Sequence, residues 1–578
     1  MAQAPTDDLT DLRPILDAHG GEGRPALLPV LLDAQRAFGF LSPPVVEAIG
    51  RELRVPLAEI HGVIEFYTML YPQPVGRTIV RVCTSPICSA LGGEAVLGAA
   101  SRHLKVEPGE ITPDGAWTIE GVECLGLCDL APAALVGDTP VAHADGARPA
   151  AWIGAPAAAP LGKIGGTPRW LSSRCGEIDP VDVDAFVQRD GFAGLRRAVR
   201  NLTPVQVVEE IKGSGLVGRG GAAFPTGTKW EMTAAAQGEL RYVVCNADES
   251  EPGTFKDRLL LEGDPLSVIE GMTVAGYAVG ARRGFVYVRG EYPRAQAILQ
   301  RALEAAQRAG YLGERILGTG FSFDIELRSG AGAYICGEET SLFESIEGRR
   351  GFPRLKPPFP TTHGLFGAPT VINNVETLCT AAWILAHGVE AYRSIGTEDS
   401  PGSKLFCVSG DVVDPGVYEI PFGTTLGELL RLAGGPRGEL QALLLGGAAG
   451  AFAGPDQLDL PLSFEGLRAA GLPLGSGVVA AFNRTRDLRA TLLSLAHFFA
   501  HESCGKCFPC QLGTQRQLEL VDRIAAGVAR PDDIRTLEDV GFTMTNASLC
   551  GLGMTAGSAI LSAVQRWPEL MLDGRATG

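Results

Sequence analysis

The sequence feature that most constrains the fold is a cysteine quartet near the end of the chain. Three of its members share one short loop with the spacing C-x2-C-x2-C, and the fourth follows in the run Ser-Leu-Cys-Gly-Leu-Gly. Three thiolates on a tight turn with a remote fourth are typical of a [4Fe–4S] cubane. Structural zinc is the alternative, although it uncommonly takes three ligands so close together. The quartet consists of Cys504, Cys507, Cys510 and Cys550. This quartet therefore favours an electron-transfer protein whose C-terminal region holds an iron–sulfur cluster.

A second quartet stands earlier in the chain, as a C-x4-C pair followed by a C-x3-C pair. Each pair comes at the end of a strand-like run, and Gly126 allows the second loop to turn tightly. Four converging thiolates suit a tetrahedral zinc ion or an iron–sulfur cluster equally, and buried cysteines without a ligand are a third interpretation. The quartet consists of Cys83, Cys88, Cys124 and Cys128.

The other five cysteines stand singly, and we interpret them as small buried apolar residues. They are Cys175, Cys245, Cys336, Cys379 and Cys407. The first residues, MAQAPTDDLTDL, contain neither the basic nor the apolar run of a secretory signal. We therefore expect a cytoplasmic protein. Because thiols stay reduced there, the thirteen cysteines point to metal or redox use and not to disulfides.

Composition and charge limit the function classes. Hydrophobic residues make up 45% and charged residues 20% of the 578 residues, as in ordinary globular proteins, and this length predicts several domains. The formal net charge of −16 opposes binding to nucleic acid or to an anionic membrane surface. The long uncharged stretches 357–375 and 540–565 are interrupted by Gly or Pro and by polar residues, so we expect no membrane span.

Hydrophobic periodicity divides the chain into five regions. A helical region is followed by a small α/β region, a longer α/β block, a compact α+β module and a final helical region. The segment 138–168 is rich in Ala, Pro and Gly, and we expect it to be loop and linker. The predicted bounds of the regions are 1–72, 73–157, 170–395, 402–484 and 486–578. The expected fold class is therefore multidomain, with α/β and α+β units.

A glycine-rich loop, GRGGAAFPTGTKW, opens the motifs of the longer α/β block at Gly218. Its backbone N–H groups and Lys229 suit a phosphate. A turn that needs positive φ would select glycine equally, so the loop alone does not establish nucleotide binding. Because the loop does not follow a strand-like run, we do not expect the usual dinucleotide-binding fold around it.

Two further loops combine small residues with carboxylates. The run CNADESEPGTFKDR starts at Cys245, at the end of a strand-like run, and GAGAYICGEETS starts at Gly330. An acidic loop is commonly just solvated, but ligands of α/β domains bind at strand ends. We therefore expect the two loops to line one pocket.

With these motifs assembled, the chain closely resembles the flavin-bearing, NADH-oxidising subunit of respiratory complex I and its soluble relatives. The matching runs, in family order over about residues 170–565, are GRGGAAFPTGTKW, CNADESEPGTFKDR, GAGAYICGEETS, PRLKPPFP, INNVET and ESCGKC…CGLG. Residues 10–155 resemble the thioredoxin-like [2Fe–2S] subunit that accompanies it, fused in front. The resemblance implies an N-terminal helical bundle with a thioredoxin-like ferredoxin domain, an FMN-binding α/β domain, a β-grasp-like module and a C-terminal helical bundle with a [4Fe–4S] cluster.

The resemblance implies four cofactors: FMN, NAD(H), a [2Fe–2S] cluster on the earlier quartet and a [4Fe–4S] cluster on the later one. FMN would lie among Gly218, Arg219, Gly220, Gly221, Lys229, Asn246, Asp248, Glu249, Tyr334, Gly337, Glu338, Glu339, Asn373, Asn374 and Thr377. The dinucleotide would meet Glu251, Phe224, Lys356 and Phe359. Aromatic rings and a lysine suit adenine and phosphate. The carboxylates expected at the reacting centre are Glu251 and Glu249.

Two positions depart from the family pattern. Ala223 replaces a usual glycine, and Met232 stands where an aromatic residue often supports adenine. We expect the contact with adenine to differ and flavin placement to be unaffected.

The resemblance also implies the reaction. Hydride passes between nicotinamide and flavin without a protein nucleophile, and single electrons pass through the clusters to or from partner subunits. The fusion looks most like the beta subunit of soluble NAD-dependent formate dehydrogenase, whose partner would be a catalytic subunit with a molybdenum or tungsten pterin. The alternatives are the diaphorase subunit of an NAD-reducing hydrogenase, partnered by hydrogenase subunits, and a fused complex I subunit. A further alternative, from a different functional class, is a scaffold subunit that holds zinc in its cysteine sites and performs no redox chemistry.

Overall fold

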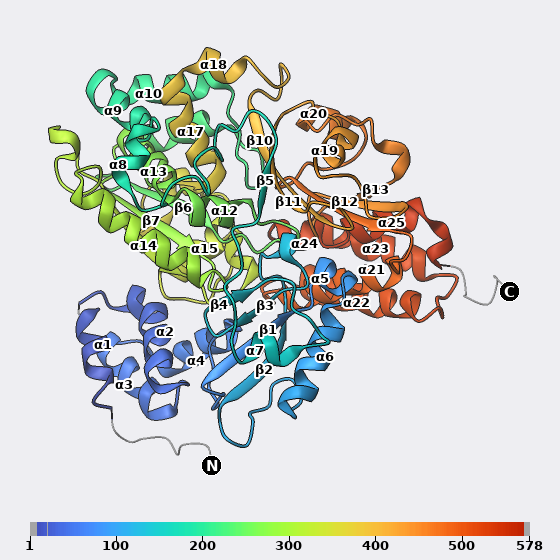
Figure 1. Cartoon of the computed structure of the whole chain (residues 1–578). Coiled ribbons are helices and arrows are strands. Elements are labelled where there is room, and N and C mark those ends of the chain that lie inside the picture. The colour runs from blue at the N-terminus through green and yellow to red at the C-terminus, as the bar shows by residue number, and fades with distance from the viewer. Residues whose placement is uncertain (1–8, 20, 572–578) are drawn as a thin grey trace.

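The computed structural model describes residues 9–19 and 21–571. Its architecture confirms the expected multidomain mixture of α/β and α+β units (Figure 1). In Figure 1 the N-terminal helices, in blue, and the C-terminal helices, in red, lie on opposite sides of the view.

The N-terminal unit is a helical bundle. Its helices are α1 (Leu12–Ala18), α2 (Leu27–Phe38), α3 (Pro43–Leu53) and α4 (Leu57–Phe66). α2 and α3 each bury an apolar face, as amphipathic helices do. Just after α4, the backbone N–H groups of Thr68 and Met69 donate to the carbonyls of Gly332 and Ala331. The bundle is thereby joined to the loop that carries Tyr334.

The thioredoxin-like domain follows, with a four-stranded sheet in the order β2-β1-β3-β4. Its elements are β1 (Thr78–Cys83), α5 (Pro86–Ala90), α6 (Gly93–Leu104), β2 (Trp117–Val122), β3 (Ala134–Val136), β4 (Thr139–Val141) and α7 (Pro149–Ile153). β1 and β2 are parallel, and Cys83 pairs with Val122 at their ends. Because parallel strands end at the same edge, the cysteine loops after β1 and β2 meet there.

The central domain holds a four-stranded parallel sheet in the order β8-β7-β6-β9. Its strands are β6 (Tyr242–Ala247), β7 (Arg283–Val288), β8 (Asp324–Ser329) and β9 (Thr370–Asn374). Its helices are α8 (Val183–Gln188), α9 (Ala193–Asn201), α10 (Pro204–Ser214), α11 (Thr226–Ala235), α12 (Lys256–Gly263), α13 (Pro265–Val279), α14 (Pro293–Arg308), α15 (Glu339–Ile346), α16 (Pro360–His363), α17 (Val375–His387) and α18 (Val389–Arg393). The carboxyl ends of the four strands share one edge, where ligands of such sheets bind.

The β-grasp-like module contributes most of a six-stranded sheet in the order β13-β12-β14-β10-β11-β5. Its elements are β10 (Ser403–Gly410), β11 (Gly416–Pro421), α19 (Leu426–Leu432), β12 (Leu440–Leu445), β13 (Ala451–Ala453), α20 (Phe464–Ala469) and β14 (Val478–Asn483).

The segment 138–168, expected to be loop and linker, holds β4, α7 and the edge strand β5 (Lys163–Gly165), which corrects that expectation. β5 pairs in parallel with Gly416–Tyr418 of β11. The Tyr418 ring lies where a side chain at Gly165 would be, so glycine permits the close approach. A strand of three residues is too short for periodicity to reveal.

The C-terminal helical domain comprises α21 (Leu488–Glu502), α22 (Phe508–Ala525), α23 (Asp533–Ala547), α24 (Gly551–Thr555) and α25 (Ser558–Arg566). Cys507 and Cys550 immediately precede α22 and α24, so the starts of two helices position their thiols. Within the described ranges, no helix has both the length and the hydrophobicity needed to cross a bilayer.

Candidate active site

A cavity of about 1090 Å³ lies at the carboxyl ends of β6 and β9. Its near wall belongs to the central domain, and its far wall to the β-grasp-like module and the C-terminal helices. The near-wall residues fall within 220–223, 246–257 and 334–338, with Asn374; the far-wall residues fall within 446–451, 464–476 and 551–565. The glycine-rich loop and both acidic loops therefore meet at one cavity.

The predicted cofactor residues divide into two groups. Those in the cavity wall are Gly220, Gly221, Asn246, Asp248, Glu249, Glu251, Tyr334, Gly337, Glu338 and Asn374. Those outside the wall are Gly218, Arg219, Phe224, Lys229, Glu339, Lys356, Phe359, Asn373 and Thr377. The second group lies behind the wall or on the surface beside it.

Glu251 lies where the central domain meets the β-grasp-like module. Its carboxylate accepts a hydrogen bond from the Tyr334 hydroxyl and another, of 2.7 Å, from the backbone N–H of Ala449. Burial raises the pKa of Glu251 to about 7, although both hydrogen bonds oppose the shift. A buried acid with a pKa near neutrality can hold or release a proton, which suits a place beside a reacting group.

Glu249 is engaged differently. Its carboxylate accepts from the backbone N–H groups of Asp257 at 2.8 Å and Arg258 at 2.9 Å, and from the Tyr292 hydroxyl at 3.0 Å. Burial raises the pKa of Glu249 to about 7, and the like charge of Asp257 adds to the shift. Because all three bonds are internal, Glu249 anchors the start of α12 and with it the loop 246–257.

The cavity offers polar groups that a bound ligand would satisfy. The Asp248 Oδ2 atom is buried in the wall and has no hydrogen-bond partner within the described ranges. Burial raises the pKa of this carboxyl well above its usual range. At Gly221, where φ is +114°, a side chain would project into open space. A planar ring with carbonyl and N–H groups along its edges satisfies such a wall, so the residues fit the isoalloxazine of FMN.

Several predicted residues support the glycine-rich loop from behind. The Arg219 backbone N–H donates to Thr377 Oγ1 at 2.9 Å, and its guanidinium donates to the Tyr392 hydroxyl at 2.6 Å. The indole N–H of Trp230 donates to Asn373 Oδ1 at 2.8 Å. These buried contacts fix the loop against β9 and α17, and two glycines of the loop form part of the cavity wall.

Ala223 lies further along the same loop, and Lys229 lies in the helix α11 that follows it. The Lys229 ammonium donates to the Ile372 carbonyl at 3.0 Å, and burial lowers the pKa of this lysine. Ala223 has φ of 52°, in the left-handed region, which costs a non-glycine residue about 1–2 kcal/mol. This conformation explains why glycine is the family's usual residue here.

Large apolar side chains stand exposed beside α11 and α16, outside the cavity. They are Phe224, Met232 and Phe359, which are 45%, 43% and 54% exposed. The Lys356 ammonium contacts Glu338 at 2.9 Å and Glu339 at 3.0 Å. Met232 thus keeps an exposed apolar surface at the position where an aromatic residue is usual.

The C-terminal cysteines surround a small cavity of about 10 Å³. Ile335 and Leu552 line it together with the four cysteines, and the same two residues line the large cavity. Burial raises the pKa of Cys510 to about 11 and that of Cys550 to about 12, so binding of a cluster, which needs thiolates, releases protons. Four thiols around a cavity are a donor set for a cluster.

The N-terminal cysteines also come together, and all four are buried. The sulfur atoms of Cys124 and Cys128 lie 3.4 Å apart, and the backbone N–H of Gly126 donates to the Cys124 sulfur at 3.3 Å. Contacts with the thiols of Cys128 and Cys83 hold the pKa of Cys124 well below its usual range despite burial.

Arg289, just after the end of β7, links this quartet to the large cavity. Its guanidinium donates to the Cys124 carbonyl and, at 2.7 Å, to the Glu249 carbonyl. Arg289 is only 2% exposed, so the thioredoxin-like domain is fastened to the loop 246–257 through a buried contact.

Several residues of the cavity wall were not predicted from the sequence as cofactor contacts. Lys256 and Asp257 lie in the wall, although they belong to the motif run FKDR. The β-grasp-like module, to which the sequence assigns no chemistry, supplies Ala449 beside Glu251 and Ser476, whose hydroxyl lies 2.8 Å from that of Thr254. A glycine- and alanine-rich run, GGAAGA at 446–451, is the signal that could have pointed to this wall.

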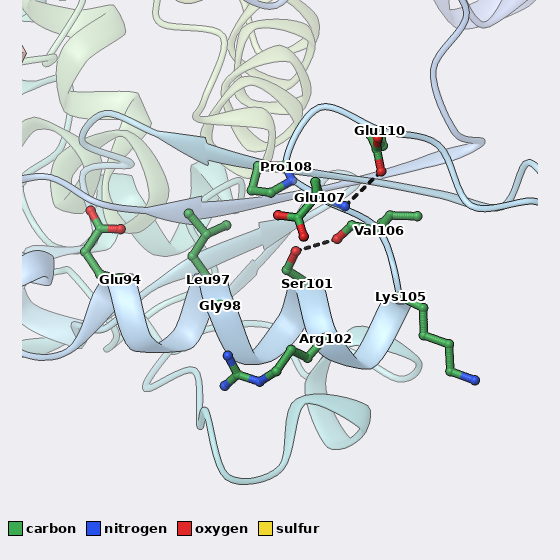
Figure 2. Close-up of a pocket in the computed structure, with 10 residues that line it drawn as sticks. All are labelled: Glu94, Leu97, Gly98, Ser101, Arg102, Lys105, Val106, Glu107, Pro108 and Glu110. Carbon is green, nitrogen blue, oxygen red and sulfur yellow. Dashed lines mark hydrogen bonds between the residues drawn. The ribbon is translucent and has the colours of Figure 1, made fainter.

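A second cavity, of about 520 Å³, lies on the thioredoxin-like domain along α6 (Figure 2). Figure 2 shows Glu94, Arg102 and Lys105 on the helix side and Glu107 and Glu110 on the following loop. Neither cysteine quartet contributes to its wall. Its mixed charges define no ligand class.

Four family models match the chain. They describe a thioredoxin-like [2Fe–2S] ferredoxin (residues 12–154), the Nuo51 FMN-binding domain (211–383), an SLBB domain (405–447) and the NADH-ubiquinone oxidoreductase-F iron–sulfur binding region (490–573). These matches confirm the expected FMN, [2Fe–2S] and [4Fe–4S] cofactors and, with the relatives below, NAD(H).

Similar proteins extend these matches. The chain is 36% identical over 570 residues to the alpha subunit of the NAD-reducing hydrogenase HoxS of Cupriavidus necator, covering 95% of this chain and 91% of that protein. It is 44% identical over 389 residues to an NADH-quinone oxidoreductase subunit of Aquifex aeolicus, covering 67% of this chain and 90% of that protein. A chain in the crystal structure of an NAD+-reducing [NiFe]-hydrogenase in its H2-reduced state superposes with a TM-score of 0.83 at 34% identity, covering 95% of this chain and 93% of that one. The chain therefore belongs to the family of flavin-bearing NADH dehydrogenase and diaphorase subunits, with the thioredoxin-like [2Fe–2S] domain fused in front.

Proposed function

We propose that this chain moves electrons between NAD(H) and a partner subunit of a larger complex. The observation that carries the proposal is the shared wall of two cavities: Ile335 and Leu552 line both the flavin cavity and the cavity of the C-terminal quartet. The two cavities are therefore neighbours. When bound, FMN supplies the exchange between two-electron hydride chemistry and single-electron transfer.

The protein's own residues hold and orient the reactants. We assign Glu251 to the nicotinamide side, because its buried carboxylate stands in the wall between Tyr334 and Ala449. Asp248, with its unpaired oxygen, is assigned to the flavin ring. Glu249 acts as a positioning residue, since its carboxylate is engaged by the start of α12.

The exposed apolar residues beside α11 and α16 suit the adenine end of the dinucleotide. Phe224 and Phe359 offer ring faces for stacking, and the Lys356 ammonium suits a phosphate or ribose. Met232 offers a flexible thioether in place of a ring, so we expect weaker or altered stacking.

An exposed apolar surface next to the C-terminal quartet supports partner docking there. It lies on α22, α23 and α24 and consists of Phe508, Leu512, Phe542 and Met554, which are 75%, 63%, 71% and 39% exposed. Phe508 directly follows the ligand Cys507. The three helices pack against one another, and exposed apolar side chains on neighbouring helices are a feature of protein interfaces. Electron transfer to a partner needs the cluster close to that interface.

We infer that the partner is a hydrogenase-type subunit. The inference is supported by the similarity to a hydrogenase subunit over 95% of this chain, which includes the fused thioredoxin-like domain. The formate dehydrogenase interpretation, with a molybdenum or tungsten pterin partner, rests on the resemblance of the sequence alone. The complex is proposed to be cytoplasmic.

Two preparations test the proposal. The purified chain alone should reduce an artificial dye with NADH and should oxidise neither H2 nor formate. The tagged chain, isolated with its partners from its own cells, should reduce NAD+ with H2 and contain nickel. Reduction of NAD+ by formate, with molybdenum or tungsten present, would support the formate interpretation instead, and recovery with quinone-reducing membrane subunits would favour complex I.

Docking is tested with matched substitutions. Phe508→Asp should abolish recovery of the partner and leave NADH-dependent dye reduction within about twofold of wild type. The control is Val528→Asp, which places the same charge at another exposed apolar position of this domain, where Val528 is 58% exposed. It should change neither the recovery of the partner nor the NADH-dependent dye reduction. Recovery of the partner with Phe508→Asp would remove the docking assignment.

A further inference from the structure

The β-grasp-like module reaches the flavin cavity through a buried chain of charged side chains. Lys404, on β10 of the module, donates to Glu376 Oε2 at 3.0 Å, and the backbone N–H of Leu405 donates to Glu376 Oε1 at 2.9 Å. Glu376 lies in the first turn of α17 of the central domain. Lys404 and Glu376 are both 0% exposed.

The chain of contacts continues to the cavity wall. The Lys256 ammonium lies 3.1 Å from the same Glu376 oxygen and donates to Asp257 Oδ1 at 2.7 Å and to Asn374 Oδ1 at 3.2 Å. The Asn374 amide in turn donates to Asp257 Oδ2 at 2.6 Å. Lys256, Asp257 and Asn374 line the flavin cavity, whereas Lys404 does not.

The charges depend on one another. Burial alone would raise the pKa of Glu376, but Lys404, Lys256 and Arg219 outweigh it and hold that pKa below its usual value. Buried ions are tolerated only when they are paired and hydrogen-bonded. Without the Lys404 charge, Glu376 depends more strongly on Lys256, whose ammonium also bonds Asp257 and Asn374.

We propose that Lys404 of the β-grasp-like module is a positioning residue for the flavin: through Glu376 and Lys256 it sets the placement of Asn374 and Asp257 in the cavity wall and the charge beside the isoalloxazine. The proposal rests on the function proposed above, because it takes the large cavity as the flavin site. The module is then part of that site although most of its sheet lies outside the cavity. The proposal gives a function to the buried lysines Lys256 and Lys404, neither of which takes a direct part in hydride transfer.

The test uses the full chain, stripped of FMN, and the variant Lys404→Met, which removes the charge and keeps a similar volume. FMN affinity, measured by flavin fluorescence titration, should fall at least about tenfold. Reduced flavin carries more negative charge than oxidised flavin, so loss of a nearby cation should weaken its binding more. An extra tenfold loss for the reduced form would lower the two-electron midpoint potential by about 30 mV.

The matched control is Lys163→Met, in β5 of the same sheet. Lys163 is paired with Asp414 at 3.0 Å but is 51% exposed and lies outside the cavity wall. It should leave both FMN affinity and midpoint potential unchanged. Lys404→Arg, which restores the charge, should recover most of the affinity lost in Lys404→Met. If Lys404→Met binds oxidised and reduced FMN within twofold of the Lys163→Met control, the proposal is overturned.

A second variant keeps the test possible if Lys404→Met does not fold. The pair Lys404→Met with Glu376→Gln removes both members of a buried ion pair, a change that is commonly tolerated. Folding is checked by the absorbance of the two clusters and by the melting temperature. Because Lys404 acts through Glu376, the double variant should bind FMN within about twofold of Glu376→Gln alone. A further tenfold loss of affinity relative to Glu376→Gln would overturn the proposal. Failure of the wild-type chain itself to bind FMN would instead remove the proposed function.

Discussion

The guanidinium of Arg258 donates to both carboxylate oxygens of Asp129, at 2.9 and 3.2 Å. Its Nε donates to the Gly126 carbonyl at 2.9 Å. Arg258 follows the acidic loop of the large cavity, whereas Gly126 and Asp129 lie beside Cys124 and Cys128 of the N-terminal quartet. Both members of the ion pair are nearly fully buried. The contact therefore docks the thioredoxin-like domain on the central domain at the place where their two sites approach each other.

Arg258→Met should loosen this docking. The change leaves the Asp129 carboxylate buried without its cation, which typically costs about 3–5 kcal/mol. We expect a lower melting temperature and faster proteolysis in the segment 138–168. Arg148→Met is the control, because Arg148 pairs with Asp145 on the surface of the same domain and such pairs contribute about 0–1 kcal/mol. Equal melting temperatures of the two variants would contradict the assigned docking contact.

Glu251→Ala should impair NAD(H) turnover and leave FMN bound. The physical reason is the placement of this carboxylate between Tyr334 and Ala449, beside the proposed nicotinamide position. Flavin content by absorbance and steady-state dye reduction measure the two effects separately. A parallel fall in flavin content and activity would show that Glu251 belongs to the flavin contacts instead.

Lys229→Ala should lower FMN occupancy. A charged hydrogen bond to the flavin phosphate typically contributes about 1.5–3 kcal/mol, which corresponds to roughly 10- to 150-fold in affinity. Lys212→Ala is matched to it, since Lys212 precedes the same glycine-rich loop and pairs with Glu231 on the surface. Full retention of flavin by the Lys229 variant would remove this lysine from the phosphate site.

Glu270→Gln tests a buried carboxyl outside the walls of the cofactor cavities. Glu270 accepts from the backbone N–H groups of Phe192 at 2.9 Å and Leu195 at 3.0 Å, and burial raises its pKa to about 7. Between the unfolded pKa near 4.5 and the folded pKa, the folded chain keeps a proton that the unfolded chain releases. Stability from this group is therefore present below pH 4.5 and falls as the pH rises to about 7.

In Glu270→Gln the side chain at this position has no proton to lose between pH 4.5 and 7. The melting temperature of wild type relative to Glu270→Gln should therefore decrease from about pH 5 to about pH 8, by the equivalent of roughly 2–3 kcal/mol. Scanning calorimetry of both proteins at the two pH values measures the difference. A difference that is constant with pH, or that increases, would contradict the raised pKa.

The sequence predicts the local elements that carry the cysteines well. The strand-like runs expected before the two cysteine pairs of the earlier quartet are β1 and β2, because apolar β-branched residues and flanking turns mark them. The convergence of the acidic loops follows from their place at strand ends. The strands follow from the local sequence pattern, and the meeting of the acidic loops follows from the rule that ligands bind at the carboxyl ends of parallel strands.

The far wall of the cavity is not predictable in this way. Ala449 reaches Glu251, and Lys404 reaches Glu376, from another domain of the chain. Such pairs depend on how domains pack, which periodicity does not encode. The same holds for β5, whose three residues form a strand only because β11 lies beside them.

The central claim is that NADH delivers electrons through this chain to the C-terminal cluster. The most direct measurement is electron paramagnetic resonance of the purified, cofactor-loaded chain frozen after anaerobic addition of NADH. We expect bleaching of the flavin and the signal of a reduced [4Fe–4S] cluster. In Cys507→Ser we expect flavin bleaching without that signal. A wild-type chain that bleaches its flavin but shows no reduced [4Fe–4S] cluster, or that contains zinc in place of iron, would contradict the claim.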